Sequence, residues 1–293
     1  MCQQHARRHT LADVVYIGSD IASLSELVES LTGKSFEKNS NQQNQYGSFS
    51  GYPPPYYDGY LKLMYVAIRL SSGCPCHCTY CGTNQIQPFY AFKNPAAVAE
   101  EIRVFVKEKG ITNVVFYDDA LLLNSNKTIQ PLLETLLSYG INRTNVQIHT
   151  PNGLSCRHIT PEIAKLMYQS GFVDPRLSLE SADPARQEQT GGKVRTDEFL
   201  RALKFLRAAN ESNGSPDGYD PSEISVYLML GLPGQEFSEV ESTIAAVQHT
   251  KTRIRLVEYS PVPGTEEFDK SSIGYDADPL LNNNTIWCFQ NPE

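Results

Sequence analysis

Four cysteines fall within eight residues of the chain, and this stretch constrains the fold more than any other. Cys74, Cys78 and Cys81 are spaced C-x3-C-x2-C, with Cys76 between them, directly after an apolar, strand-like run over residues 63–70. Thiolates are soft ligands for iron–sulfur clusters and zinc, and closely spaced cysteines in a chain without a secretory signature indicate metal binding rather than disulfides. The chain is therefore expected to carry one compact metal centre on a short loop.

Two kinds of metal centre fit this loop. Cubane iron–sulfur clusters commonly have four cysteine ligands, so a three-cysteine set leaves one iron open, and an open position marks a catalytic metal. A closed zinc site would need Cys76 as a fourth ligand, in a string tighter than the usual pairs of zinc ligands. The sequence favours the three-thiolate cluster, with Cys76 as a spare thiol, over a structural zinc module.

Length and charge limit the class of protein. The chain has 293 residues, 40% of them hydrophobic, which is enough for one large α/β barrel or two smaller domains. A net charge of −8 provides no basic field for phosphate backbones, so nucleic acid is not an expected partner. The start MCQQHARRHTLADVVYIG lacks the apolar core of a signal peptide, and no run approaches the ~18 apolar residues of a membrane span. These patterns predict a cytoplasmic protein that does not bind membranes.

Strand-like and helix-like segments alternate from Leu63 onward, as in a parallel sheet covered by helices. The predicted strands are 63–69, 113–117, 146–149, 176–180, 224–230 and 254–258. Helices are predicted between them, with end signals at Asn94-Pro95, Gly110, Gly140, Thr160, Gly171 and Thr196, and a capping box of Ser238 and Glu241. Six strands with five helices predict an α/β fold, a partial (β/α)6 barrel of the TIM type, whose active residues follow the carboxyl ends of the strands.

The segments that flank this barrel have different patterns. Residues 1–34 contain one predicted strand at 14–18 and one helix that stops at Gly33, and a single strand–helix unit cannot bury a core unaided. Residues 35–60 are rich in polar and turn residues and are predicted to be a linker. The barrel core is placed at 61–268 and an irregular C-terminal segment at 269–293.

The cysteine motif, with the aromatic Tyr80 before its last cysteine, resembles the signature of the radical S-adenosylmethionine (SAM) superfamily. The surrounding SSGCPCHCTYCGT is similar to the subgroup whose members often carry a cobalamin-binding domain in front. This resemblance, over about residues 60–268, implies that Cys74, Cys78 and Cys81 hold a 4Fe-4S cluster whose free iron chelates SAM. An electron from the cluster then cleaves SAM and releases a 5′-deoxyadenosyl radical.

The same resemblance makes the strand–helix unit at 1–34 look like the remnant of a cobalamin-type doubly wound domain, so the chain is expected to be truncated. The pattern D-x-H-x-x-G, which supplies the cobalamin lower ligand in that family, is absent from the sequence. Cobalamin is therefore doubtful and is not assigned. A methylthiotransferase is disfavoured, because the extra N-terminal three-cysteine cluster of that class is missing.

The ends of the predicted strands supply the other expected SAM contacts. Asp118 and Asp119 follow the second strand, where the resemblance implies a motif that binds the amino group of SAM, and a carboxylate suits an ammonium group. The alternative is that both aspartates merely cap the next loop. Glu180 shares the inward face of the fourth strand with Ser178, by the period of two along a strand. The residues predicted to bind SAM are Tyr80, Asp118, Asp119, Glu180, Ser181 and Gly231.

Three other residues have less certain roles. His149, at the end of the third strand, is either a general acid or base or a hydrogen-bonding loop residue, and the second interpretation is favoured. Cys156 is either a thiol that donates a hydrogen atom or a buried, inert cysteine, and again the second is favoured. Asn152 and the segment SPVPGT at 260–265 resemble recurrent features of the subgroup, with no role assigned.

The predicted function is that of a radical SAM enzyme, possessing methyltransferase-like chemistry by analogy, that modifies a small-molecule or unknown substrate. An electron donor such as ferredoxin or flavodoxin is the expected partner. The alternative is a non-catalytic iron–sulfur protein that binds a partner or relays electrons.

Overall fold

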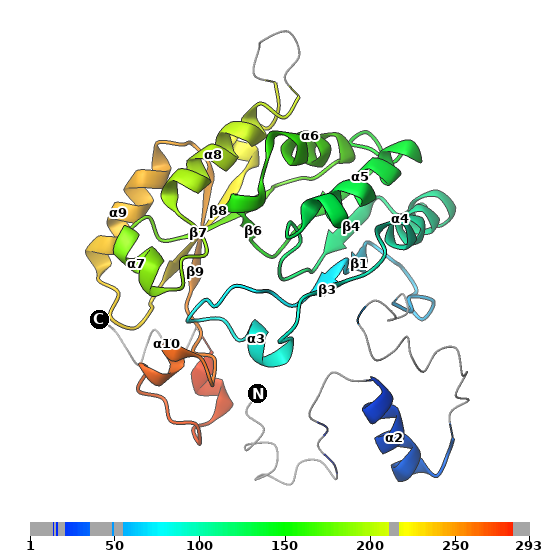
Figure 1. The fold of residues 1–293 in the computed structure, drawn as a ribbon, viewed down its shortest axis with the longest axis horizontal. Coiled ribbons are helices and arrows are strands. Elements are labelled where there is room, and N and C mark those ends of the chain that lie inside the picture. Colours follow the sequence, from blue (N-terminus) through cyan, green and yellow to red (C-terminus); the bar gives the residue numbers. More distant parts are fainter. Residues whose placement is uncertain are drawn as a thin grey trace.

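The computed structural model describes Val14, Tyr16, residues 21–35, Phe49, residues 55–210 and residues 217–283. Parallel strands form a curved sheet, and an arc of helices from α4 to α9 covers its outer side (Figure 1). The strands are β1 (Val66–Ile68), β2 (Ser71–Ser72), β3 (Ala91–Phe92), β4 (Asn113–Phe116), β5 (Gln147–His149), β6 (Leu154–Ser155), β7 (Arg176–Glu180), β8 (Ser225–Leu230) and β9 (Arg253–Glu258). The helices are α2 (Ile21–Thr32), α3 (Thr83–Ile86), α4 (Pro95–Arg103), α5 (Ile129–Ser138), α6 (Pro161–Ser170), α7 (Pro184–Gln189), α8 (Thr196–Arg207), α9 (Phe237–Gln248) and α10 (Glu266–Asp269).

The barrel sheet is parallel throughout and runs in chain order. One part has the order β1-β4-β5 and the other β6-β7-β8-β9. A bridge between Ile148 and Phe172 joins them, and Leu154 then pairs with Leu177. The segment 147–155 is therefore one strand in two halves, β5 and β6, with neighbours on both sides. The chain has the predicted α/β fold, with parallel strands in the order expected for a partial (β/α)6 barrel of the TIM type.

All six predicted strands are confirmed as β1, β4, β5, β7, β8 and β9. Several short elements were not predicted, namely β2, β3, β6, α3, α7 and α10. The antiparallel pair β2–β3 joins Ser71 to Phe92 and brackets the cysteine loop, and α7 is a helix of six residues between β7 and α8. Elements this short contain too few residues to show a hydrophobic period.

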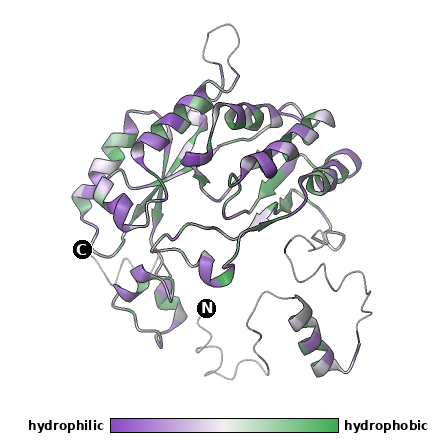
Figure 2. Ribbon diagram, viewed as in Figure 1, coloured by the Kyte–Doolittle hydropathy of each residue, from purple (hydrophilic) through white to green (hydrophobic). Residues whose placement is uncertain are grey.

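The two faces of the sheet differ in chemistry. Leu177, Leu179, Val226 and Leu228 are at most 1% exposed and belong to the core that the helices cover. Figure 2 shows this hydrophobic character in the strands, against outer helices of mixed polarity. Successive residues of a strand point to opposite faces, so the alternate positions line the lumen. They are largely polar: Arg176, Ser178, Tyr227, Met229, Arg255 and Val257. The lumen is therefore suited to a polar ligand.

At the starts of the helices, two predicted caps are confirmed and two are wrong. Asn94 and Thr160 cap α4 and α6 by accepting hydrogen bonds from Ala96 N (2.9 Å) and Ile163 N (3.2 Å). Thr196 does not cap α8 but is its first residue, because its hydroxyl is bonded to Gln187 and to the carbonyl of Ala182.

The capping box predicted from Ser238 and Glu241 is wrong. Helix α9 begins at Phe237, with Glu236 in the N-cap position and no side-chain cap. Ser238 therefore lies inside the first turn, where its side chain cannot act as the N-cap.

Gly171 ends α6 in a left-handed conformation, with φ of 93°. A β-carbon at this position would collide with the carbonyl oxygen of Val146, beside the strand β5. Gly140, after α5, has a similar φ of 68°, but the nearest atom to its β-carbon would be Lys107 Nζ at 3.9 Å. We expect Gly171→Ala to lower the free energy of unfolding by about 2 kcal/mol more than Gly140→Ala in urea titrations. Equal losses would contradict the tight contact at Gly171.

The flanking segments are described in part. Helix α2 and Gly33, with φ of 66°, agree with the predicted N-terminal helix and its stop. Only Val14 and Tyr16 of the predicted strand 14–18 are described, so that prediction lies outside the described residues. After Phe268 the described chain contains the end of α10 and a short helical turn at Pro279–Asn282, while residues 284–293 lie outside it. No described helix has the length and apolar character needed to cross a bilayer.

Candidate active site

The cysteine loop lies between β2 and α3, at the carboxyl end of the strands. It borders a cavity of about 440 Å³, within the range of roughly 300–1,000 Å³ that is usual for small-molecule sites. The cavity walls come from the cysteine loop and from the ends of β4, β5, β7, β8 and β9. The polar and sulfur-containing residues that line it are Cys74, Cys76, Cys78, Tyr80, Cys81, Thr83, Asp119, Asn152, Ser178, Glu180, Lys193, Tyr227 and Met229.

All four cysteines of the loop carry free thiols beside this cavity. The Cys74 and Cys76 thiols hydrogen-bond each other, which raises the pKa of Cys74 and lowers that of Cys76 to about 7. Burial raises the pKa of Cys78, and the positive charge of Lys193 opposes that shift. Because a metal binds thiolates, a nearby ammonium group favours the form of the loop that can hold one.

The donor set fits a cluster better than a single ion. Among the residues that the structure describes, no three His, Cys, Asp or Glu side chains lie close enough together to hold one metal ion. A closed zinc site needs four sulfurs on one ion at about 2.3 Å each. A 4Fe-4S cluster instead binds its thiolates on separate irons, so the motif thiols that line the cavity need not converge on one point.

The two predicted aspartates have different surroundings. The Asp118 carboxylate is 3% exposed and accepts hydrogen bonds from Leu70 N (3.3 Å), the Ser71 hydroxyl (2.7 Å) and Ser71 N. It thus ties the end of β4 to the strand that enters the cysteine loop. Asp119 lines the cavity and forms an ion pair of 3.5 Å with Arg69. Asp119, and not Asp118, therefore lines this cavity.

Burial raises the pKa of Asp118 from 3.8 to about 6. A raised carboxyl pKa means that the folded protein binds this proton more tightly than the unfolded chain does. Stability from this group is therefore present below pH 4 and lost as the pH rises through about 6. We expect urea titrations of the metal-free protein to show a loss of about 2–3 kcal/mol across this window that Asp118→Asn removes. The matched variant at an exposed position, Asp197→Asn, should keep the wild-type pH profile.

Glu180 ends β7 in a strained backbone conformation. Its φ is 66°, which is rare outside glycine, and Ser181 N donates to Leu179 O at 2.8 Å across it. These features describe a tight γ-turn of the rarer hand, which shifts the register of β7 against β8. Strained residues persist where the surrounding structure holds them, and they cluster at functional sites.

Lys193 is the partner of Glu180. Its Nζ lies 3.6 Å from Glu180 Oε1 and donates to Ser178 Oγ at 3.3 Å, and the two charged side chains are 22% and 16% exposed. Burial alone would lower the pKa of Lys193, but the negative charges of Glu180 and the loop cysteines raise it overall. The cavity therefore contains a protonated ammonium group close to the cysteine loop.

Tyr80 also forms part of the cavity wall. It lines the cavity beside Glu180 and packs against a small apolar cluster that includes Tyr259 and Phe268. Burial, followed by the charges of Glu180 and Cys78, raises the pKa of Tyr80 well above its usual value. The Tyr80 side chain is therefore a neutral phenol at physiological pH.

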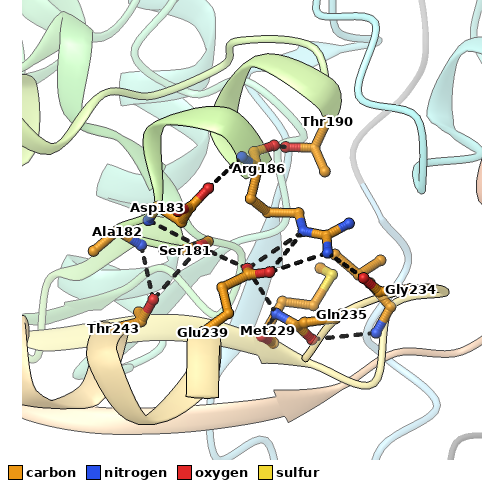
Figure 3. A network of polar contacts seen from close by, with 11 residues as sticks. Ser181, Ala182, Asp183, Arg186, Thr190, Met229, Gly234, Gln235, Glu239 and Thr243 are labelled. Carbon is orange, nitrogen blue, oxygen red and sulfur yellow. Dashed lines mark hydrogen bonds and ion pairs between the residues drawn. The ribbon is translucent and has the colours of Figure 1, made fainter. Parts of the chain in front are cut away.

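Ser181 and Gly231 have other surroundings. The Ser181 hydroxyl donates to Glu239 Oε1 at 3.0 Å and accepts from Asp183 N, in the polar network between α7 and α9 shown in Figure 3. Glu239 in turn pairs with Arg186 at 3.0 Å. Gly231, with φ of 83°, follows β8 and does not line the cavity. The structure therefore brings Tyr80, Asp119 and Glu180 together with the cysteines, and it places Asp118, Ser181 and Gly231 around them.

The three residues with less certain roles also have defined contacts. His149 shares a 2.9 Å hydrogen bond with Asn113, and burial and the nearby Arg176 lower its pKa. Cys156 is fully buried, which raises its pKa to about 12, as expected for an inert cysteine. Asn152 lines the cavity and donates to the carbonyl of Asp118 at 3.0 Å.

Sequence reasoning missed Lys193. The only signal is the string TGGK at 190–193, a glycine pair followed by a lysine between two helices. Nothing in that string shows that the loop packs against the cysteine loop, because the two segments are distant in the sequence.

Comparisons with known proteins identify the family of the chain. The family model described as Radical SAM superfamily matches residues 68–247. An uncharacterized methyltransferase of Pyrococcus horikoshii is 24% identical over 86% of this chain and 56% of its own length. The GTP 3′,8-cyclase of Microcystis aeruginosa is 21% identical over 72% of this chain and 60% of its own length. The chain thus spans less than two thirds of these relatives.

A solved structure shows the same fold. The radical SAM methyltransferase TsrM from Kitasatospora setae, with cobalamin and a 4Fe-4S cluster bound, superposes with a TM-score of 0.57 at 15% sequence identity. The match covers 69% of this chain and 38% of TsrM.

Proposed function

Since the chain belongs to the radical SAM superfamily, we propose that it cleaves SAM reductively at a 4Fe-4S cluster held by Cys74, Cys78 and Cys81. The observation that carries the proposal is the cavity itself. It gathers the three motif cysteines, one ammonium group and two carboxylates at the carboxyl ends of the strands, where α/β barrels place their active sites. When bound, the cluster supplies the electron that breaks a carbon–sulfur bond of SAM and releases the 5′-deoxyadenosyl radical.

The protein's own residues would bind and orient the methionyl end of SAM. Lys193 offers an ammonium group to the SAM carboxylate, and Asp119 offers a carboxylate to the SAM amino group. Glu180 keeps Lys193 charged and aimed at the cavity, because its own position is fixed by the γ-turn. Asp118 would act indirectly, because it binds Ser71 in the strand that precedes the cysteine loop.

The substrate and partners complete the proposal. A carbon-centred, methyltransferase-like modification of a small molecule is proposed by analogy to the methyltransferase relatives. The electron donor is proposed to be of the ferredoxin or flavodoxin class. The protein is proposed to be located in the cytoplasm. Cobalamin is left out, because the sequence lacks the lower-ligand pattern.

Anaerobic reconstitution tests this function. The protein is loaded with iron and sulfide, reduced with dithionite and mixed with SAM. We expect about four irons and four sulfides per chain and the formation of 5′-deoxyadenosine. A cluster without 5′-deoxyadenosine would support an electron relay instead, and the absence of any cluster would overturn both iron–sulfur functions.

A further inference from the structure

Thr79 lies between Cys78 and Tyr80, and two distant segments hold all of its polar groups. Its side chain is buried, at 8% exposure. Its N–H donates to the carbonyl of Thr190 at 3.4 Å, and its carbonyl accepts from Glu267 N at 3.2 Å. Its hydroxyl donates to Glu267 Oε1 at 2.8 Å. The middle of the cysteine loop is thus fixed from two sides.

The first of the two segments that hold the cysteine loop is the loop after α7. Gly191 adopts a φ of 98°, and a β-carbon there would lie 2.5 Å from the carbonyl oxygen of His77 and 3.3 Å from Cys78 Cα. The backbone of this loop therefore rests directly on the backbone of the cysteine loop, and only glycine allows that approach. The neighbouring Gly192 also has a positive φ, of 61°, but a β-carbon there would meet nothing within 4 Å.

The second side is α10, which follows the segment SPVPGT. Thr265 of that segment caps α10 by accepting from Phe268 N at 3.2 Å, which places Glu267 in the first turn. Glu267 is 1% exposed, and its Oε1 atom binds both Thr79 and Lys270, the latter at 2.7 Å. Its Oε2 atom has no hydrogen-bond partner among the described residues. A buried carboxylate is costly unless it is hydrogen-bonded, so its bond to Thr79 is an important one.

We propose that the backbone of Thr190 and Gly191 on one side and Glu267 on the other form a clamp around Thr79, on residues 77–79, that positions the cysteine loop to receive its cluster. This assignment gives the SPVPGT segment a role, because it presents Glu267 to the loop. The proposal rests on the proposed function insofar as the loop holds a cluster. Gly191, Thr79 and Glu267 are positioning residues here, since each acts through the loop rather than by contact with a reacting group.

Cysteine alkylation in the metal-free protein tests the clamp without any cluster. Wild type, Thr79→Val, Thr79→Ser, Gly191→Ala and Gly192→Ala are treated with iodoacetamide, and labelling of each cysteine is followed by mass spectrometry. We expect Thr79→Val and Gly191→Ala to label the partly buried Cys78 roughly tenfold faster than wild type, because the lost contacts release the loop, whereas the already exposed Cys81 should change little. Thr79→Ser keeps the hydroxyl and Gly192→Ala avoids the contact, so both should stay within about twofold of wild type.

Iron retention gives the second measurement. In reconstituted protein, Thr79→Val and Gly191→Ala should lose iron to a chelator roughly tenfold faster than their matched variants. Equal rates within each pair, in either experiment, would overturn the clamp. So would faster labelling of the buried Cys156 together with Cys78, because that pattern reports general unfolding. If wild type itself binds no iron, the proposed function fails, whereas the alkylation rates still decide the clamp.

Discussion

Replacing Cys78 with alanine is expected to abolish both the cluster and the cleavage of SAM. Cys78 is one of the three motif cysteines among the four thiols that line the cavity, and we expect a cubane with only two protein ligands to be lost. Iron should fall from about four per chain to near zero, and 5′-deoxyadenosine should fall at least about a thousandfold. Iron analysis, electron paramagnetic resonance of the reduced protein and chromatography of the products measure these changes.

Cys76→Ala is the matched control for this experiment. Cys76 lies two residues from Cys78 and lines the same cavity, and its thiol is hydrogen-bonded to Cys74. Loss of that hydrogen bond removes the largest cause of the raised pKa of Cys74, so Cys74 becomes a better ligand. Cys76→Ala is expected to keep the cluster and the cleavage. Equal loss in both variants would contradict the three-ligand assignment.

Lys193→Met is expected to give the second-largest effect. If the ammonium group binds the SAM carboxylate, its loss removes charge-assisted hydrogen bonds in a partly buried site, and affinity for SAM should fall about 30- to 150-fold. Isothermal titration of the reconstituted, unreduced protein measures this without turnover. Lys165→Met, at an exposed position on α6, should bind SAM like wild type.

A second substitution separates binding from folding. Lys193→Met also leaves Glu180 without its partner at 3.6 Å, which should lower the free energy of unfolding by about 1–3 kcal/mol. Adding Glu180→Gln removes the unpaired charge, so the double variant should regain most of that stability while its SAM affinity stays low. Recovery of both properties would show that Lys193 has only a structural role.

The sequence predicted the barrel well because the signals for its elements are local. The runs that became β4, β7 and β8 alternate or stay apolar over four to six residues, and Gly140 and Gly171 end their helices as expected. The capping box of α9 failed because helix ends shift by a residue or two without changing the hydrophobic pattern.

The sequence predicted only those parts of the site that depend on local patterns. The cysteine spacing and the strand ends could be found by inspection, but Asp118 and Asp119 have the same chemistry and differ only in direction. One binds Ser71 inside the protein and the other faces the cavity. Ser181 was likewise misplaced because its direction could not be predicted: it follows Glu180 in the chain, but its hydroxyl binds Glu239 of α9. Lys193 and Glu267 were missed because their contacts join distant parts of the chain.

The clamp on Thr79 also bears on the order of events during biogenesis. Thr79 and Glu267 are 188 residues apart, and contacts of such separation form late, because a long loop must close first. A nascent chain that has been synthesised only as far as its cysteines lacks both the loop after α7 and Glu267. If the clamp positions the loop as proposed, we expect the cluster to be inserted after the barrel has folded, rather than to nucleate the folding of the barrel.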